Sequence, residues 1–192
     1  MKTYVKWSVM ATVSSTLLLT SYWGYVYETG NFHTVAVEHA YRSGQLDEQQ
    51  LTRYIRSYKI KTIVNLRGPN AGSKWYRDEL RISDQLGVHH HDFDISAKQE
   101  VSDETLDTIL HLMRDMPKPI LIHCGSGADR TGLIAAVYQY SIGHQQAQEA
   151  SSQLSVLYGH FPYLGNPSVA MDRSYWRYVK THATAQLSQQ RP

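Results

Sequence analysis

The stretch LIHCGSGADRTG, residues 121–132, contains the only cysteine of the chain, Cys124. An apolar run precedes this cysteine, so a buried strand is expected to end there, and Thr131 is expected to open a helix. The turn between them would gather backbone N–H groups at a helix N-terminus, where the helix dipole adds positive potential. Gly125 and Gly127 allow positive φ and close approach of a ligand. Such a turn suits a tetrahedral oxyanion.

Side chains in the same stretch suit nucleophilic attack on phosphorus. The amides of the turn would favour the thiolate form of Cys124, which is the nucleophilic form. Arg130 can direct two N–H groups at phosphate oxygens, and the Thr131 hydroxyl could stabilise the thiolate as a leaving group. The predicted phosphate-binding residues are Gly125, Ser126, Gly127, Ala128, Asp129, Arg130 and Thr131.

HCGSGADRTG resembles the His-Cys-x5-Arg-Thr/Ser-Gly signature of the cysteine-dependent protein tyrosine and dual-specificity phosphatases. YRSGQL and IVNLRG resemble the opening strands of compact bacterial members, so the resemblance runs from about Tyr41 to about Gly159. It implies a phosphoryl transfer in two steps, without metal or cofactor. Cys124 would attack phosphorus, Arg130 would stabilise the transferring group, and water would hydrolyse the cysteinyl-phosphate. His123 would support the loop by hydrogen bonds.

The general acid of this reaction has three candidates. In most of the family it is an aspartate on a mobile loop a few tens of residues before the cysteine, and Asp92 and Asp94 satisfy that spacing. HDFDIS still alternates like a strand, however. The third candidate is Asp129, inside the signature. It could instead brace the loop by accepting backbone hydrogen bonds or by pairing with Arg67, a supporting residue.

The composition of the loop favours phosphotyrosine or mixed phosphoprotein substrates. None of its variable residues is basic, whereas relatives that act on phosphoinositides often carry lysine there, and one acidic side chain disfavours highly charged ligands. Lys74, Arg77 and Lys98 could still form a basic rim, so phosphoinositides or inositol phosphates remain the alternative. More distant alternatives are a rhodanese-like sulfurtransferase and a non-catalytic phosphoprotein-binding module, which would have no need of Cys124.

Composition argues against several other classes. The chain has 192 residues, of which 42% are hydrophobic and 19% charged, as expected of a globular domain. A net charge of +2 without a long basic run does not support binding to nucleic acid. One cysteine excludes an internal disulfide. Three consecutive histidines, residues 89–91, would alternate faces on a strand without a further ligand, so no metal site is expected. The oligomeric state stays open.

The N-terminus predicts a membrane segment. Residues 7–27 carry no charge, and as a helix they would span roughly 31 Å, enough to cross the hydrocarbon core of a bilayer. Lys2 and Lys6 precede them, and aromatic residues cluster near both ends. We therefore expect residues 1–27 to be a single-pass signal anchor, with the catalytic domain on the extracytoplasmic or periplasmic side. The alternative is a cleaved signal peptide and secretion to the periplasm.

The remainder predicts an α/β domain. We expect a linker over 28–39, a dual-specificity-type phosphatase domain over 40–184 and a polar tail over 185–192. Strands are predicted at 40–46, 61–68, 88–95 and 120–124, alternating with helices at 47–60, 73–87 and 102–116, and followed by helices at 131–143, 145–159 and 169–182. This order favours a central, mostly parallel sheet flanked by helices, with the phosphate loop between a central strand and a helix and a helical C-terminal half.

Overall fold

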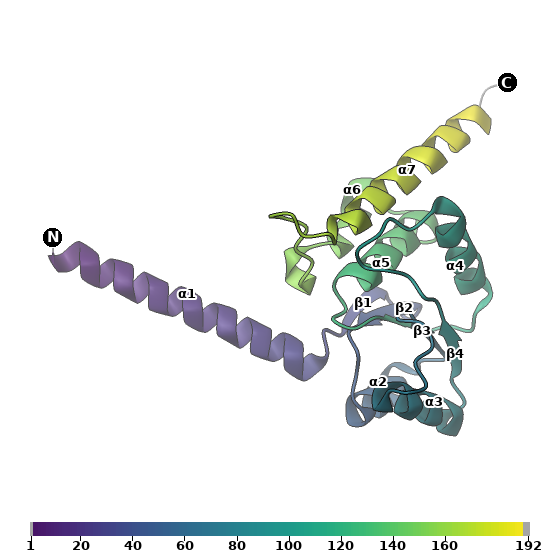
Figure 1. Ribbon diagram of the computed structural model, residues 1–192, viewed down its shortest axis with the longest axis horizontal. Helices are drawn as coiled ribbons and strands as arrows, with labels where there is room; N and C mark the ends of the chain where they lie inside the picture. The colour runs from purple at the N-terminus through teal and green to yellow at the C-terminus, as the bar shows by residue number, and fades with distance from the viewer. Residues whose placement is uncertain (1, 190–192) are drawn as a thin grey trace.

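The apolar runs of the sequence form a five-stranded sheet that lies between two layers of helices (Figure 1). The computed structural model describes residues 2–189. The strands stand in the order β1-β2-β5-β3-β4, and their bounds are β1 (His33–Ala36), β2 (Ala40–Ser43), β3 (Thr62–Asn65), β4 (His89–Asp92) and β5 (Ile120–His123). β1 pairs antiparallel with β2, and every other neighbouring pair is parallel. The expected α/β fold with a central, mostly parallel sheet is therefore confirmed.

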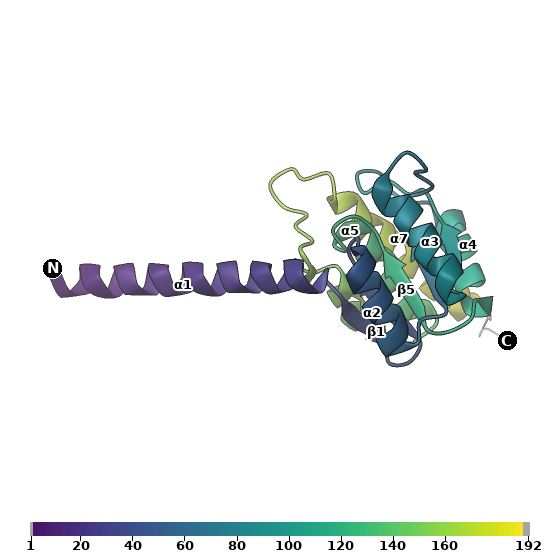
Figure 2. The ribbon, with the colours of Figure 1, turned by 90° about the horizontal axis from the view of Figure 1, so that it is seen from below.

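Helices cover both faces of this sheet, as Figures 1 and 2 show. Asp47 and Ser102 cap the first turns of two helices with their side chains, and Gly87 ends a third at φ 65°. Aspartate and serine are favoured at the N-cap, and glycine is favoured just after the last turn. The helices of the two layers are α2 (Glu48–Tyr58), α3 (Lys74–Leu86), α4 (Asp103–Asp115), α5 (Asp129–Ser141) and α7 (Val169–Gln189).

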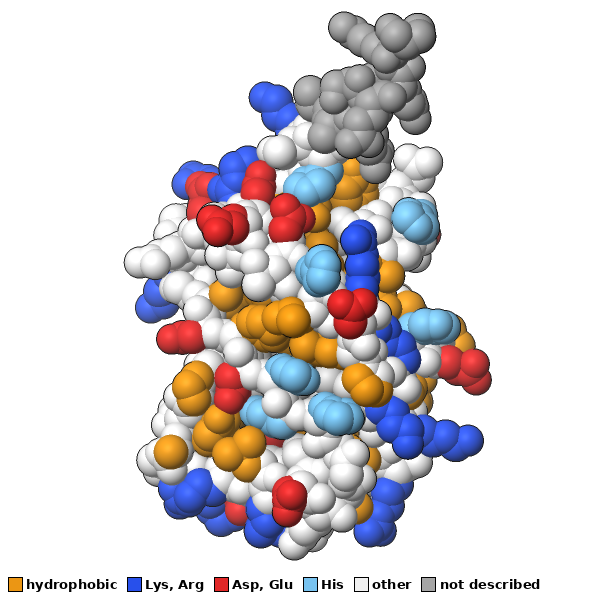
Figure 3. Space-filling view, turned by 90° about the vertical axis from the view of Figure 1, so that its right-hand side faces the viewer, with side chains coloured by type: hydrophobic (Ala, Val, Ile, Leu, Met, Phe, Trp, Pro, Cys, Tyr) orange, Lys and Arg blue, Asp and Glu red, His pale blue; other side chains and the backbone are white. Residues whose placement is uncertain are grey.

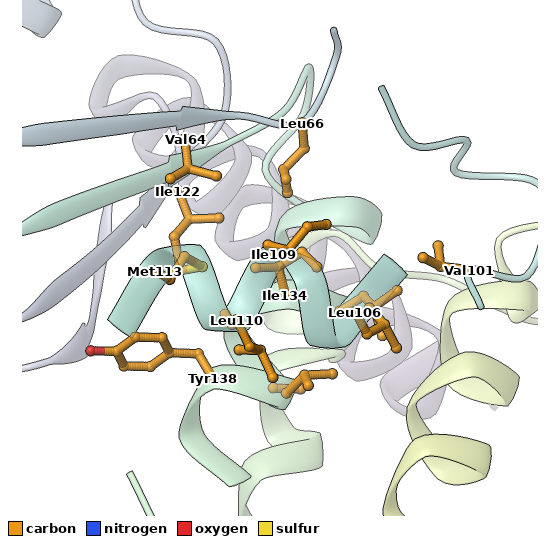
Figure 4. Packing of buried hydrophobic residues seen from close by; sticks show 14 of the residues in the cluster. Val64, Leu66, Val101, Leu106, Ile109, Leu110, Met113, Ile122, Ile134 and Tyr138 are labelled. Atoms are coloured by element: carbon orange, nitrogen blue, oxygen red, sulfur yellow. The ribbon is translucent and has the colours of Figure 1, made fainter. Parts of the chain in front are cut away.

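Two hydrophobic cores lie on the two faces of the sheet. Because successive strand residues point to opposite faces, Ile63 and Leu121 pack in the core under α2 and α3, whereas Val64 and Ile122 pack in the larger core under α4, α5 and α7 (Figure 4). Every residue of α5 from 131 to 139 is buried. The helix that follows the cysteine is therefore held on all sides.

The segment between α5 and α7 departs from the prediction of one helix over 145–159. It contains one helical turn, α6 (Ala147–Ala150), followed by the 3-10 turns η1 (Ser151–Gln153) and η2 (Val156–Tyr158). The Ser151 hydroxyl donates to the carbonyl of Gln148 at 2.7 Å. Such local bonds of serine compete with continuation of a helix.

Both ends of the expected domain carry further structure. The segment 28–39, expected to be a linker, contains β1, which pairs with β2 at the edge of the sheet. At the other end, α7 continues to residue 189. Of the expected tail 185–192, residues 190–192 lie outside the described residues.

The N-terminal segment forms α1 (Lys2–Thr29), which extends away from the rest of the molecule in Figures 1 and 2. Within residues 2–189, no helix combines the length and the apolar character that a membrane crossing requires. The predicted single-pass anchor, and with it the membrane-anchored localisation, is therefore wrong.

The composition of α1 explains this correction. Seven of the 21 residues from 7 to 27 are serine or threonine, and three are tyrosine. Several of the threonines donate to the carbonyl four residues earlier, as Thr12 does to Ser8 at 3.0 Å and Thr16 does to Thr12 at 2.9 Å. The absence of charge and the length of the segment predicted a membrane-spanning helix. The polar side chains, however, lower the mean hydropathy of α1 below the value that a membrane crossing requires.

Candidate active site

The signature stretch connects the central strand of the sheet to the N-terminus of the buried helix α5. Cys124 directly follows β5 and is 2% exposed. The helix begins at Asp129, two residues earlier than expected, so Arg130 and Thr131 lie in its first turn. Ala128 precedes the helix without a side-chain cap. The first N–H groups of α5 can therefore bind the oxygens of an anion.

The loop packs backbone against backbone on the end of β2. The N–H of Gln45 donates to the carbonyl of Gly125 at 2.8 Å. Gly127 has φ 76°, and a Cβ there would lie 2.6 Å from the nitrogen of Gly44 and 2.7 Å from the carbonyl carbon of Ser43. Only glycine fits this position, for both reasons.

A buried arginine of β2 holds the same loop, and this role was not predicted from the sequence. Arg42 of β2 donates through Nη2 to the Gly127 carbonyl at 2.6 Å, and through Nη1 to the backbone and side-chain oxygens of Gln153, both at 2.7 Å. Its guanidinium stacks on the ring of Tyr158. Burial lowers the pKa of Arg42 to about 10, against the charges of Tyr158 and Cys124, which raise it. The side chain therefore stays charged at neutral pH.

Further hydrogen bonds hold Ser126 and Thr131 of the signature in place. The Asn31 side chain donates to the carbonyls of Ser126 and Tyr158, both at 2.9 Å. The Ser126 hydroxyl accepts from the N–H of Ala128 at 3.3 Å, and the Thr131 hydroxyl donates to the Ser43 carbonyl at 3.4 Å. The loop is thus braced by β2 and by the segment after α1.

The Arg130 guanidinium is fixed at one edge. Its Nη1 donates to the carbonyls of Leu66 at 3.1 Å and Ile95 at 3.3 Å. Its Nε is buried without a hydrogen-bond partner among the described residues. Because a guanidinium binds an oxyanion through two parallel N–H groups, the Nε edge can bind phosphate oxygens without losing its protein contacts.

The three candidate acids differ in what their carboxylates contact. Asp92 accepts from Asn65 Nδ2 at 2.7 Å and from the Tyr76 hydroxyl at 2.5 Å. Asp129 binds His160 Nδ1 at 2.7 Å, so it pairs with this histidine and not with Arg67. Both carboxylates are held by other side chains.

Asp94 differs from the other two. It is exposed, and its side chain has no hydrogen-bond partner within the part of the chain that the structure describes. It lies against Gly68, where an added Cβ would be 2.7 Å from the Asp94 Cβ. With Arg130 and Lys98 it lines one open pocket. The structure therefore brings Asp94, and not Asp92, to the arginine of the signature.

Only one of the three expected rim cations belongs to this pocket. Lys98 lines it. Lys74 instead pairs with Glu48 at 2.9 Å and with a carboxylate of its own helix. Arg77 donates to the carbonyls of Ala71 and Gly72, both at 2.9 Å. The basic rim is therefore narrower than the sequence suggests.

His123 and Arg67 connect to a buried glutamate that was not predicted. Glu79 of α3 accepts from His123 Nε2 at 3.1 Å and from Gln45 at 2.9 Å. Arg67 Nη1 donates to Gln45 Oε1 at 2.8 Å. The guanidinium carbon of Arg67 lies 3.7 Å from the centre of the Trp75 ring. A glutamate on the buried stripe of a predicted amphipathic helix is the signal that could have revealed this network.

The histidines of β4 do not form a metal centre. Several histidine side chains gather on the face that Figure 3 shows. Across residues 2–189, however, no group of three or more histidine, cysteine or acidic side chains is arranged to hold a metal ion. His90 instead faces inward and binds Glu79 at 2.8 Å.

Comparison with solved structures shows the same fold in phosphatases. The core catalytic domain of the PP-IP phosphatase SIW14 from S. cerevisiae aligns with a TM-score of 0.60 and 19% identity, covering 81% of this chain and 92% of that one. P. aeruginosa TpbA in complex with pTyr gives 0.57 and 20%, covering 78% and 91%. Tk-PTP gives 0.58 and 20%, covering 77% and 97%. At these identities the likeness establishes the fold.

Comparison of the sequence with family models establishes the family. None of the curated proteins in the comparison matches the chain. The model of the tyrosine phosphatase family matches residues 24–150, which is more than half of the chain and includes the whole stretch from Cys124 to Arg130. The protein therefore belongs to the tyrosine phosphatase family and is a phosphoric monoester hydrolase.

Proposed function

We propose that Cys124, Arg130 and Asp94 hydrolyse phosphate monoesters in two steps. In the first, the Cys124 thiolate attacks phosphorus, so that the sulfur–phosphorus bond forms as the ester oxygen leaves. The Asp94 carboxyl gives its proton to that oxygen. Arg130 and the amides of the loop stabilise the charge on the three remaining oxygens.

The second step returns the groups to their starting state. Water attacks phosphorus, and the Asp94 carboxylate accepts its proton. The sulfur–phosphorus bond breaks, the thiolate of Cys124 leaves, and inorganic phosphate is released. All three residues lie within the expected phosphatase domain, residues 40–184.

The anchoring of Arg130 is the observation that carries this proposal. One edge of its guanidinium is held by two backbone carbonyls, and its buried Nε has no partner among the described residues. An arginine held in this way binds an oxyanion without first losing side-chain entropy. Asp94 lines the same pocket, where its proton can reach a leaving group.

Phosphotyrosine is the substrate that we favour. The loop residues between Cys124 and Arg130 include no cation, and only Lys98 of the three expected rim cations lines the pocket. Highly phosphorylated inositols need several cations to neutralise their charge. The fold does not separate the two substrate classes, because TpbA in complex with pTyr and the PP-IP phosphatase SIW14 share it.

Release of inorganic phosphate tests this proposal. A phosphotyrosine peptide and a set of inositol phosphates are offered to the full chain and to Cys124→Ser. We expect the peptide to give the higher kcat/KM and Cys124→Ser to abolish turnover of both. If Cys124→Ser kept the parental activity, Cys124 would not be the nucleophile. A higher kcat/KM for the inositol phosphates would exclude phosphotyrosine as the preferred substrate.

A further inference from the structure

We propose that Glu79 is a positioning residue for the nucleophile, acting through His123 on the backbone carbonyl of Cys124. The inference rests on the proposed role of Cys124. Glu79 lies on α3, more than forty residues before the signature, and is 3% exposed. A buried carboxylate without hydrogen-bond partners would strongly destabilise the fold, so its partners show which side chains it positions.

Three N–H donors converge on this carboxylate. Oε1 accepts from His123 Nε2 at 3.1 Å and from His90 Nε2 at 2.8 Å, and Oε2 accepts from Gln45 Nε2 at 2.9 Å. Burial by itself raises the pKa of the Glu79 carboxyl. The charge of His123, together with hydrogen bonds from all three donors, holds this pKa well below its usual range. Glu79 is therefore ionised at neutral pH.

The second nitrogen of His123 reaches the nucleophile's own backbone. Nδ1 lies 3.4 Å from the carbonyl oxygen of Cys124, where β5 passes into the loop. An ionised carboxylate and a carbonyl only accept hydrogen bonds. His123 therefore donates through Nε2 to Glu79, and Glu79 is the acceptor that fixes the orientation of the ring beside the Cys124 backbone.

A neutral amide could not replace Glu79. The Gln45 amide is oriented by Arg67, whose Nη1 donates to Gln45 Oε1 at 2.8 Å, so Gln45 must direct its NH2 group at residue 79. Glutamine at position 79 has one acceptor oxygen for three donors, and its own NH2 would face another donor. At least one buried partner would lose its hydrogen bond. The His123 ring would then lose the acceptor that fixes its orientation.

Steady-state kinetics of Glu79→Gln with p-nitrophenyl phosphate test the proposal. We expect kcat to fall at least about tenfold while KM changes by less than about threefold, because the nucleophile and not the binding of phosphate is disturbed. Asp78→Asn is the matched control. Asp78 is the preceding residue of the same helix, and its partners are Lys74 and Arg81 at the surface. This control should keep both constants.

A double-variant cycle separates positioning from a general loss of packing. If Glu79 acts through His123, Glu79→Gln adds less than about a threefold further loss of kcat to a His123→Asn protein. Losses that multiply would overturn the proposal, and so would a Glu79→Gln protein that retains parental kcat.

Nitrogen-15 NMR of the histidine rings gives a readout on the parent chain, in case Glu79→Gln does not fold. The chain has ten histidines, and the His123→Asn spectrum identifies the signal of His123. The Nε2 of His123 should carry a proton as the donor to Glu79, and an unprotonated Nε2 would overturn the inference.

The failure of this inference can be told apart from that of the proposed function. Cys124 is the only cysteine, so the rate of its alkylation by iodoacetamide reports on the nucleophile without any substrate. Slower alkylation in Glu79→Gln supports the positioning role even if no phosphate ester is turned over, and an unchanged rate excludes it.

Discussion

At the scale of single residues, a carboxyl group whose oxygens have no other partner is the best placed to give a proton to the leaving group. Asp92 is hydrogen-bonded to Asn65 and Tyr76, and Asp129 to His160. Asp94 is exposed at the mouth of the pocket that Arg130 lines. A carboxylate in that position can exchange protons with both a leaving group and water.

We therefore expect Asp94→Asn to lower kcat by about 100-fold to 10,000-fold on a phosphotyrosine peptide. The loss should be smaller on p-nitrophenyl phosphate, because its leaving group needs less protonation. The pH–rate profile checks the assignment, since the basic limb should disappear in Asp94→Asn and persist in Asp92→Asn and Asp129→Asn. Its disappearance in either of the other two variants would move the acid to that residue.

Gly127 supports a second prediction at this scale. Alanine there would have to take a positive φ, which lowers the free energy of unfolding by about 1–2 kcal/mol. Its Cβ would also clash with the backbone of Gly44. We expect Gly127→Ala to lower the free energy of unfolding by more than this amount and to remove activity. Gly72→Ala is the control, because nothing lies within 4 Å of its Cβ position. Denaturant titrations of both variants compare them, and equal stability would contradict the close packing of the loop.

At the scale of elements, a buried histidine joins the helix of the signature to the last helix. His160 binds Asp129 of α5 at 2.7 Å and Asp172 of α7 at 2.9 Å. Burial by itself lowers the pKa of His160, but hydrogen bonds to Asp129 and Asp172 and their charges raise it to about 9. Asp129 therefore connects α5 to α7 through His160. The positive charge of the protonated His160 ring attracts both carboxylates.

These contacts of His160 make stability depend on pH. Because the pKa of His160 is higher in the folded state than its ordinary value of 6.5, its contribution is complete below about pH 6.5 and is lost as pH rises through about 9. We expect the difference in Tm between the parent chain and His160→Gln to shrink over that interval. Thermal unfolding followed by circular dichroism at several pH values measures this difference. A difference that stays constant up to pH 10 would show that His160 is not charged in the folded state.

At the scale of the whole molecule, α1 joins the body only near its C-terminal end. The described side chains from Tyr4 to Leu17 are all exposed. Further along, the Tyr22 hydroxyl donates to the Leu157 carbonyl, and the Trp23 ring lies 3.5 Å from the position that a Cβ at Gly159 would take. Asn31, just after α1, holds the phosphate loop through Ser126.

Two truncations should therefore behave differently. Removal of residues 1–20 should leave kcat within about twofold of the full chain and the free energy of unfolding within about 0.5 kcal/mol. Removal of residues 1–31 should lower that free energy by about 1–3 kcal/mol, because the carbonyls of Ser126 and Tyr158 lose the Asn31 amide. Asn31→Ala in the full chain should reproduce part of this loss. Equal stability of the two truncations would refute the role of Asn31.

The sequence by itself determined the features that depend on contiguous residues. The cysteine, the glycines and the arginine of the phosphate loop follow one another within seven positions. The caps at Asp47, Gly87 and Ser102 act on their own helices. The alternation of strands with helices along the chain predicted the mostly parallel sheet. The prediction of a membrane helix was wrong, because the hydropathy of α1 is the sum of small contributions from many residues and its polar residues outweigh the absence of charge.

Only the tertiary structure decided which distant side chains meet. Arg42 reaches Gly127 across 85 positions, and Glu79 reaches His123 across 44. Neither pair has a fixed spacing that a sequence pattern could reveal, because parallel strands and crossing helices bring such residues together in three dimensions. The same reason separates the aspartates. All three had suitable positions along the chain, and only the folded arrangement shows that Asp129 contacts a histidine of another element whereas Asp94 faces the pocket.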